Sequence, residues 1–167
     1  MHAEAMDFGR RMLAEMVDDY KQVLEIGSRD INGSLRGLLP GVPYVGVDLL
    51  DGPGVDVVAD ILIFQPVKPP DLIICTEVLE HTSDWQQIID VAGHFLADGG
   101  HLLVTCATDP RAPHSALDGG ALRADEYYAN VSPEDLEDQI HASGLVVLKS
   151  EVYTDRGDLY ILAGKMS

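Results

Sequence analysis

The sequence predicts an α/β fold in which a mostly parallel sheet is covered by helices on both faces. Short apolar runs, which we interpret as strands, alternate with segments of helical periodicity along the chain. Most of these runs lack strict alternation of polar and apolar residues, as expected for strands buried on both sides. We expect seven strands, near residues 22–26, 44–48, 55–59, 71–76, 101–106, 145–152 and 158–164, with helices filling the gaps.

Three helices have the clearest signals. The first twenty residues carry an apolar side made of Phe8, Met12, Leu13, Met16 and Val17. A helix over about 84–97 has apolar residues at three- and four-residue intervals and is stopped by Gly99 and Gly100. A third begins after Ser132, a suitable N-cap, with Pro133 in its first turn, and ends at Gly144.

One domain is expected over residues 1–167, because a chain of this length buries a core without disulfides or metals. Both cysteines, Cys75 and Cys106, lie in apolar runs and are predicted to be free. The longest irregular segment, residues 107–131, has the length of a lid or binding loop.

Charge and hydropathy restrict the location and partners of the protein. The formal charge of −17, from 28 acidic and 11 basic residues, repels phosphate backbones and argues against naked DNA or RNA as a partner. No apolar stretch reaches the roughly 18 residues of a membrane span, and the first residues do not resemble a secretory signal. A cytoplasmic protein without membrane contact is therefore expected.

The first predicted strand, Val23-Leu-Glu-Ile, runs into Gly27 and a turn rich in polar residues. A glycine there allows the backbone to approach a ligand, with the amides from Ser28 to Gly33 pointing toward its polar groups, although many such turns bind nothing. Asp48 ends the second strand about 20 residues later, a spacing suited to ribose hydroxyls. Phosphate-binding motifs for ATP or NAD are absent from the sequence, whereas a carboxylate at Glu25 suits the ammonium group of S-adenosylmethionine.

With these residues in view, the chain resembles the class I S-adenosylmethionine-dependent methyltransferases. The resemblance rests on the strings VLEIG (23–27), YVGVD (44–48), ICTEVLEH (74–81) and L-x-x-GG (96–100), and it covers nearly the whole chain. It implies a three-layer, doubly wound, Rossmann-like domain with the strand order 3-2-1-4-5-7-6 and an antiparallel last strand. It also implies S-adenosyl-L-methionine as the cofactor.

The resemblance assigns a part of the cofactor to each matching position. Glu25 and Gly27 match the contacts to the methionine end, Asp48 the ribose contact with Leu49 beside the adenine, Asp60 and Ile61 the adenine contacts, and Thr76 and Glu77 the sulfonium region. Asp60 has an alternative role as the cap of a turn. The chain departs from the family at Arg29 and Ile31, which replace two glycines. We expect Asn32 and Gly33 to compensate, Arg29 to offer its guanidinium to the methionine carboxylate, and Ser28 to complete the pocket.

The segment Glu77-Val-Leu-Glu80-His81 has three interpretations. If it begins a helix, Glu77, Glu80 and His81 project from one face. In the first interpretation, the carboxylates shape the cofactor pocket and cap the helix, and His81 makes a local hydrogen bond. In the second, His81 is the catalytic general base. In the third, the three residues bind a divalent cation, with His114 as a fourth ligand, as similar ExxEH strings do in some methyltransferases.

The predicted function is S-adenosylmethionine-dependent methyl transfer to an oxygen or nitrogen atom of a small or modest-sized molecule. The first helix and the 107–131 loop, with His114, Tyr127 and Tyr128, are expected to hold this small-molecule acceptor. Two alternatives stay open: a degenerate domain that serves as a cofactor-binding or partner subunit, and a metal-assisted O-methyltransferase. An NAD-dependent oxidoreductase is disfavoured by the missing pyrophosphate motif. Oligomeric state does not follow from the sequence.

Overall fold

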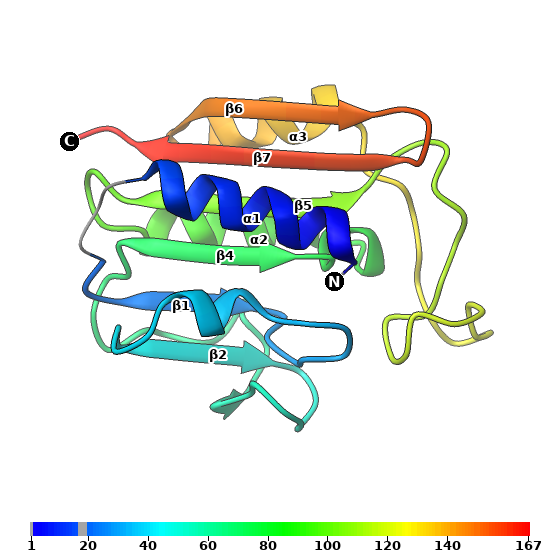
Figure 1. The fold of residues 1–167 in the computed structure, drawn as a ribbon, viewed down its shortest axis with the longest axis horizontal. Coiled ribbons are helices and arrows are strands. Elements are labelled where there is room, and N and C mark those ends of the chain that lie inside the picture. Colours follow the sequence, from blue (N-terminus) through cyan, green and yellow to red (C-terminus); the bar gives the residue numbers. More distant parts are fainter. Residues whose placement is uncertain (1, 17–19) are drawn as a thin grey trace.

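A seven-stranded sheet forms the middle layer of the computed structural model, which describes residues 2–16 and 20–167 (Figure 1). The strand order is β3-β2-β1-β4-β5-β7-β6, and only β7 runs antiparallel to its neighbours, which confirms the predicted topology. The strands are β1 (Val23–Ile26), β2 (Tyr44–Asp48), β3 (Val57–Val58), β4 (Leu72–Thr76), β5 (His101–Ala107), β6 (Leu145–Tyr153) and β7 (Asp158–Lys165).

Helices cover both faces of this sheet. One face carries α1 (Ala3–Glu15) and the short 3-10 helix η1 (Leu35–Leu38), and the other carries α2 (Trp85–Phe95) and α3 (Pro133–Ala142). Figure 1 shows α1 lying across the sheet, with its first turn near the carboxyl end of β4. A second 3-10 helix, η2 (Leu79–His81), follows β4.

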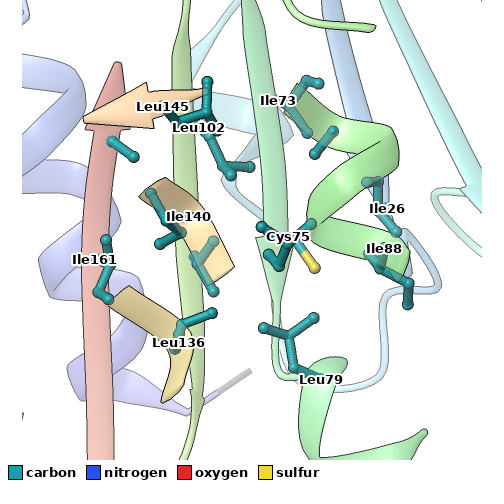
Figure 2. Packing of buried hydrophobic residues seen from close by; sticks show 14 of the residues in the cluster. Ile26, Ile73, Cys75, Leu79, Ile88, Leu102, Leu136, Ile140, Leu145 and Ile161 are labelled. Atoms are coloured by element: carbon teal, nitrogen blue, oxygen red, sulfur yellow. The ribbon is translucent and has the colours of Figure 1, made fainter. Parts of the chain in front are cut away.

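Each face has its own hydrophobic core. Figure 2 shows the core beneath α2 and α3, where Ile88, Leu136 and Ile140 meet the inward residues of the central strands. The second core joins Phe8 and Met12 of α1 to buried residues of β1, β4, β5 and β7. Because α1 is held by several fully buried side chains, its first turn has a fixed position beside the sheet edge.

Several element boundaries differ from the sequence prediction. The third strand, expected over 55–59, is reduced to Val57–Val58 at one edge of the sheet. Helices do not fill every gap: 27–43 contains only η1, and 60–71 forms turns. The helix predicted over 84–97 is Trp85–Phe95, and the first ends at Glu15; Val17 lies outside the described residues.

Strand register brings the ends of β1, β2 and β4 to one edge. Ile26 pairs with Val47 on one side and with Cys75 on the other, and Thr76 pairs with Thr105 of β5. The segments that follow these strands, which begin at Gly27, Leu49 and Glu77, therefore leave the sheet side by side. This edge is the place where open α/β sheets bind ligands.

Candidate functional site

A cavity of about 1300 Å³ lies at the carboxyl edge of the parallel strands. It exceeds the 300–1,000 Å³ of ordinary ligand pockets, so it has room for two ligands. Residues of the 107–131 loop and of the start of α1 line it. Among the predicted cofactor residues, the cavity is lined by Gly27, Arg29, Asn32, Asp48, Leu49, Asp60, Ile61, Thr76 and Glu77.

Gly27 occupies a position that only glycine tolerates. Its φ is +70°, and a Cβ there would overlap the Val78 side chain. The amides after it mostly bind the protein itself: Ser28 donates to the Val47 carbonyl, Asp30 to that of Pro53, and Gly33 to the Asp30 carboxylate. The Arg29 amide donates to the Asp48 carboxylate, so the expectation that these amides face a ligand is wrong for four positions, whose N–H groups already have partners in the protein.

Asp48 and Asp60 each have a structural partner and a face on the cavity. Asp48 accepts hydrogen bonds from the backbone N–H groups of Arg29 (3.1 Å) and Leu50 (2.9 Å). Asp60 accepts one from the N–H of Leu62 (2.9 Å), which is the turn-capping role considered above. A carboxylate has about four acceptor positions, so both retain capacity for a ligand.

Glu25, Ser28 and Gly33 are not among the residues that line the cavity. The Glu25 side chain is only 3% exposed and accepts a hydrogen bond of 2.8 Å from the Tyr44 hydroxyl. Burial raises the pKa of the Glu25 carboxyl to about 7, against the effect of the Tyr44 hydrogen bond. The assignment of Glu25, Ser28 and Gly33 to the cofactor pocket stays a prediction.

Arg29 faces the cavity, but its guanidinium is already engaged. Nη2 donates to the carbonyls of Leu117 (3.1 Å) and Ala116 (3.4 Å). The stem of the side chain packs against Gly52 in the loop after β2. Arg29 therefore joins the loops after β1 and β2 to the 107–131 loop, across one side of the cavity.

Glu77 does not belong to a helix, so the condition under which Glu77, Glu80 and His81 would share one helical face is not met. Its φ is +56°, a strained value for a residue with a side chain, and only Leu79–His81 forms a helical turn. The Glu77 carboxylate accepts hydrogen bonds from His2 Nδ1 (3.1 Å) and from the Thr105 hydroxyl (2.9 Å). The hydrogen bond that His2 donates to Glu77 raises the pKa of His2. Burial raises the pKa of the Glu77 carboxyl, but the hydrogen bonds from His2 and Thr105 and the charge of His2 together bring it below its ordinary value.

The structure instead groups Glu80, His81 and His114, with one potential ligand atom from each within 4.8 Å of the others. Glu80 is fully buried, and burial followed by the charge of Glu77 raises its pKa to about 8. Burial and then His114 lower the pKa of His81 to about 4, so its imidazole is neutral at physiological pH. Tyr128 packs edge-on against both imidazoles. Among the described residues, Glu80 Oε2 and His81 Nδ1 are buried without a hydrogen-bond partner.

Three further polar residues at the site were missed by the sequence analysis: His2, Arg111 and Asp158. Asp158 is 1% exposed and accepts hydrogen bonds from Arg111 Nη1 and Arg156 Nε (both 2.6 Å) and from the Tyr160 hydroxyl (2.8 Å). His2 Nε2 lies 3.2 Å from the same carboxylate. No local pattern identifies these residues, because their partners are up to 156 positions away in the sequence.

Comparison with known proteins gives a family and a set of similar folds. A family model described as "Methyltransferase domain" matches residues 1–150. None of the curated proteins matches the sequence significantly.

Among solved structures, the 1,6-didemethyltoxoflavin-N1-methyltransferase of Burkholderia thailandensis, with bound 1,6-didemethyltoxoflavin and S-adenosylhomocysteine, is 15% identical. The alignment covers 98% of this chain and 79% of that one, with a TM-score of 0.75. The N-methyltransferase NodS of Bradyrhizobium japonicum, in complex with S-adenosylhomocysteine, is 19% identical over 98% and 87% of the two chains, with a TM-score of 0.69. The [4+2]-cyclase SpnF is 15% identical over 96% and 81%, with a TM-score of 0.71, so the fold is also found in a protein named for a different reaction.

The α-helices in the described part of the chain have at most 13 residues. None of them is long and apolar enough to span a membrane.

The raised pKa of Glu25 predicts how stability depends on pH. A carboxyl whose pKa is higher in the folded protein contributes stability that is present below its ordinary pKa of 4.5 and is lost as the pH rises through about 7. Glu25→Gln keeps an acceptor for Tyr44 and removes this loss. The variant should gain stability relative to the wild type by up to about 3 kcal/mol between pH 4.5 and 8.

Urea unfolding across this pH range measures the effect. Glu137→Gln, at a partly exposed position on α3, is the matched control and should show no such trend. A difference between Glu25→Gln and wild type that is constant with pH would contradict the buried, raised carboxyl.

Proposed function

We propose, from the premise that this chain belongs to the methyltransferase-domain family, that it transfers the methyl group of S-adenosylmethionine to an oxygen or nitrogen atom of a small molecule. The observation that carries the proposal is the placement of Asp48, Asp60 and Gly27 around one cavity at the carboxyl edge of the sheet. We take residues 1–167 as a single catalytic domain.

In this proposal the cofactor lies across the ends of β2, β1 and β4. Asp48 accepts hydrogen bonds from the ribose hydroxyls, and Leu49, Asp60 and Ile61 surround the adenine. Thr76 and Glu77 face the sulfonium, and the methionine end lies toward the loop that follows Gly27. The remaining volume, bounded by the 107–131 loop and the first turn of α1, receives the acceptor.

Methyl transfer requires mainly the alignment of two ligands, because the sulfonium is already an activated electrophile. A lone pair of the acceptor forms the new bond to the methyl carbon as the carbon–sulfur bond breaks, which leaves S-adenosylhomocysteine. The acceptor's proton passes to a base. His81 is our candidate, because it lines the cavity and its lowered pKa keeps it unprotonated.

Cofactor binding is tested by calorimetric titration with S-adenosylhomocysteine. Asp48→Asn should weaken binding roughly 10- to 100-fold, as expected when about 1.5–3 kcal/mol of charge-assisted hydrogen bonding is lost. Asp51→Asn, at an exposed position in the same loop, should bind like the wild type. If the wild-type protein binds neither S-adenosylhomocysteine nor S-adenosylmethionine, the degenerate partner-subunit alternative replaces this proposal.

The role of His81 is tested by the pH dependence of turnover. The pKa of about 4 predicts that kcat/KM does not fall between pH 8 and 6 through protonation of this group. Because a base with a pKa of about 4 is weaker than a free imidazole, His81→Gln should lower kcat by about 10²-fold, the lower end of the usual contribution of a general base, and leave S-adenosylhomocysteine affinity unchanged. A variant with unchanged kcat would exclude His81 as the base.

A metal-assisted O-methyltransferase is a second candidate, supported by the two unpartnered buried atoms Glu80 Oε2 and His81 Nδ1 close to His114. A mixed carboxylate and imidazole set fits a transition ion such as Zn²⁺. Such an ion would lower the pKa of an acceptor hydroxyl. Glu77 is not in this set, because its carboxylate is bound to His2 and Thr105.

Metal binding is measured by titrating the chelator-treated protein with Zn²⁺, Mn²⁺ and Mg²⁺. If the second candidate holds, Zn²⁺ binds with saturation and His114→Ala weakens its binding at least tenfold, while S-adenosylhomocysteine affinity is unchanged. His94→Ala on α2 is the control, since His94 is outside the group. Absence of saturable binding in the wild type would exclude the second candidate.

A further inference from the structure

We propose that Arg111 is the anion-binding residue of the acceptor subsite and that the acceptor carries a carboxylate group. This inference rests on the proposed methyl transfer and specifies the class of its acceptor.

The Arg111 side chain is held in place from both ends. Its backbone N–H donates to the Thr108 carbonyl (2.8 Å), and its carbonyl accepts a hydrogen bond from the Asn130 side chain (3.0 Å). Gly157 makes room for this segment, because a Cβ there would overlap Thr108 O and Arg111 N. At the other end, Nη1 donates to the buried carboxylate of Asp158 at 2.6 Å. A guanidinium fixed in this way loses little entropy when it binds a ligand.

Asp158 does not need Arg111 for charge neutralisation. Its carboxylate already accepts hydrogen bonds from Arg156 (2.6 Å) and from the Tyr160 hydroxyl (2.8 Å), and it lies beside His2. A second guanidinium therefore supplies more positive charge than the buried carboxylate requires. Within the described residues, Nη1 is the only nitrogen of the Arg111 side chain that has a hydrogen-bond partner.

The carboxylates near Arg111 do not use its remaining donors. Glu77 is bound by His2 and Thr105, and Glu126 accepts hydrogen bonds from the Ser115 hydroxyl (2.7 Å) and the Arg123 N–H (2.9 Å). With His2 protonated, which its raised pKa favours, three cationic side chains surround the carboxylates of Glu77 and Asp158. These five side chains together carry one net positive charge, whereas the whole chain carries −17.

Two of these cationic side chains, His2 and Arg111, line the cavity. Arg111 lines the cavity together with His2, Glu77, His81 and His114, beyond the end of β4. A planar carboxylate matches the planar donors that Arg111 has free, and charge-assisted pairs of this type are among the stronger hydrogen bonds in proteins. If the carboxylate of an acceptor is bound to Arg111, the hydroxyl or amine of the same acceptor is held beside the sulfonium region.

The test uses benzoate and benzamide as probes of equal shape, titrated by ligand-detected NMR against the full-length protein, with and without saturating S-adenosylhomocysteine. We expect benzoate to bind at least tenfold more tightly than benzamide. Arg111→Gln should remove this preference, and Arg111→Lys should retain part of it. Arg123→Gln, which alters an exposed guanidinium of the same loop outside the cavity lining, should bind benzoate like the wild type.

Three outcomes overturn the inference: no saturable benzoate binding up to 10 mM, equal affinity for the two probes, or an unchanged preference in Arg111→Gln. Thermal unfolding of each variant shows whether the fold is retained. We expect it to be retained, since Asp158 keeps Arg156 and Tyr160 as partners. Failure of S-adenosylhomocysteine to bind contradicts the proposed function instead. The benzoate titration of the ligand-free protein still reports on Arg111 in that case.

Discussion

The site depends on the in-register pairing of β1 between β2 and β4. This pairing ends three parallel strands at one edge, so that Gly27, Asp48 and Thr76 open into the same cavity. A shift of one residue would turn the β1 side chains to the opposite faces of the sheet. It would move Leu24 and Ile26 out of one core and bring the Glu25 carboxyl into it. The two hydrophobic cores thus fix the register that the site requires.

Burial beside this edge determines the acid–base behaviour of the polar groups. The pKa values of Glu25 and Glu80 are raised because their charged forms lose hydration, and that of His81 is lowered for the same reason. Glu77 is also largely buried, but its pKa is lowered because His2 and Thr105 donate hydrogen bonds to it. Glu77 and Glu80 are only three residues apart, and the hydrogen-bond partners of Glu77 are the reason why their pKa values shift in opposite directions.

Sequence patterns predicted the parts of the structure that depend on local or repeated signals. The sheet order followed from a family resemblance carried by short strings, and the cap at Ser132 from its position before Pro133. The contacts of Arg29 with residues 116–117, and of His2 with Glu77 and Asp158, were beyond such reasoning. Each joins segments at least 75 residues apart, and a side chain's partner across such a distance is decided by packing.

These long-range contacts connect the segments that line the cavity of about 1300 Å³ in this chain of 167 residues. Arg29 ties the 107–131 loop to the loops after β1 and β2, and Arg111 ties the beginning of the same loop to β7 through Asp158. His2 joins the first turn of α1 to that carboxylate. The buried Asp158 is thus shared by the start of α1 and the 107–131 loop, which line the cavity, and by the β6–β7 turn. Because Arg156 and Tyr160 also bind this carboxylate, Asp158 holds the cavity-lining segments together while it engages only Nη1 of Arg111.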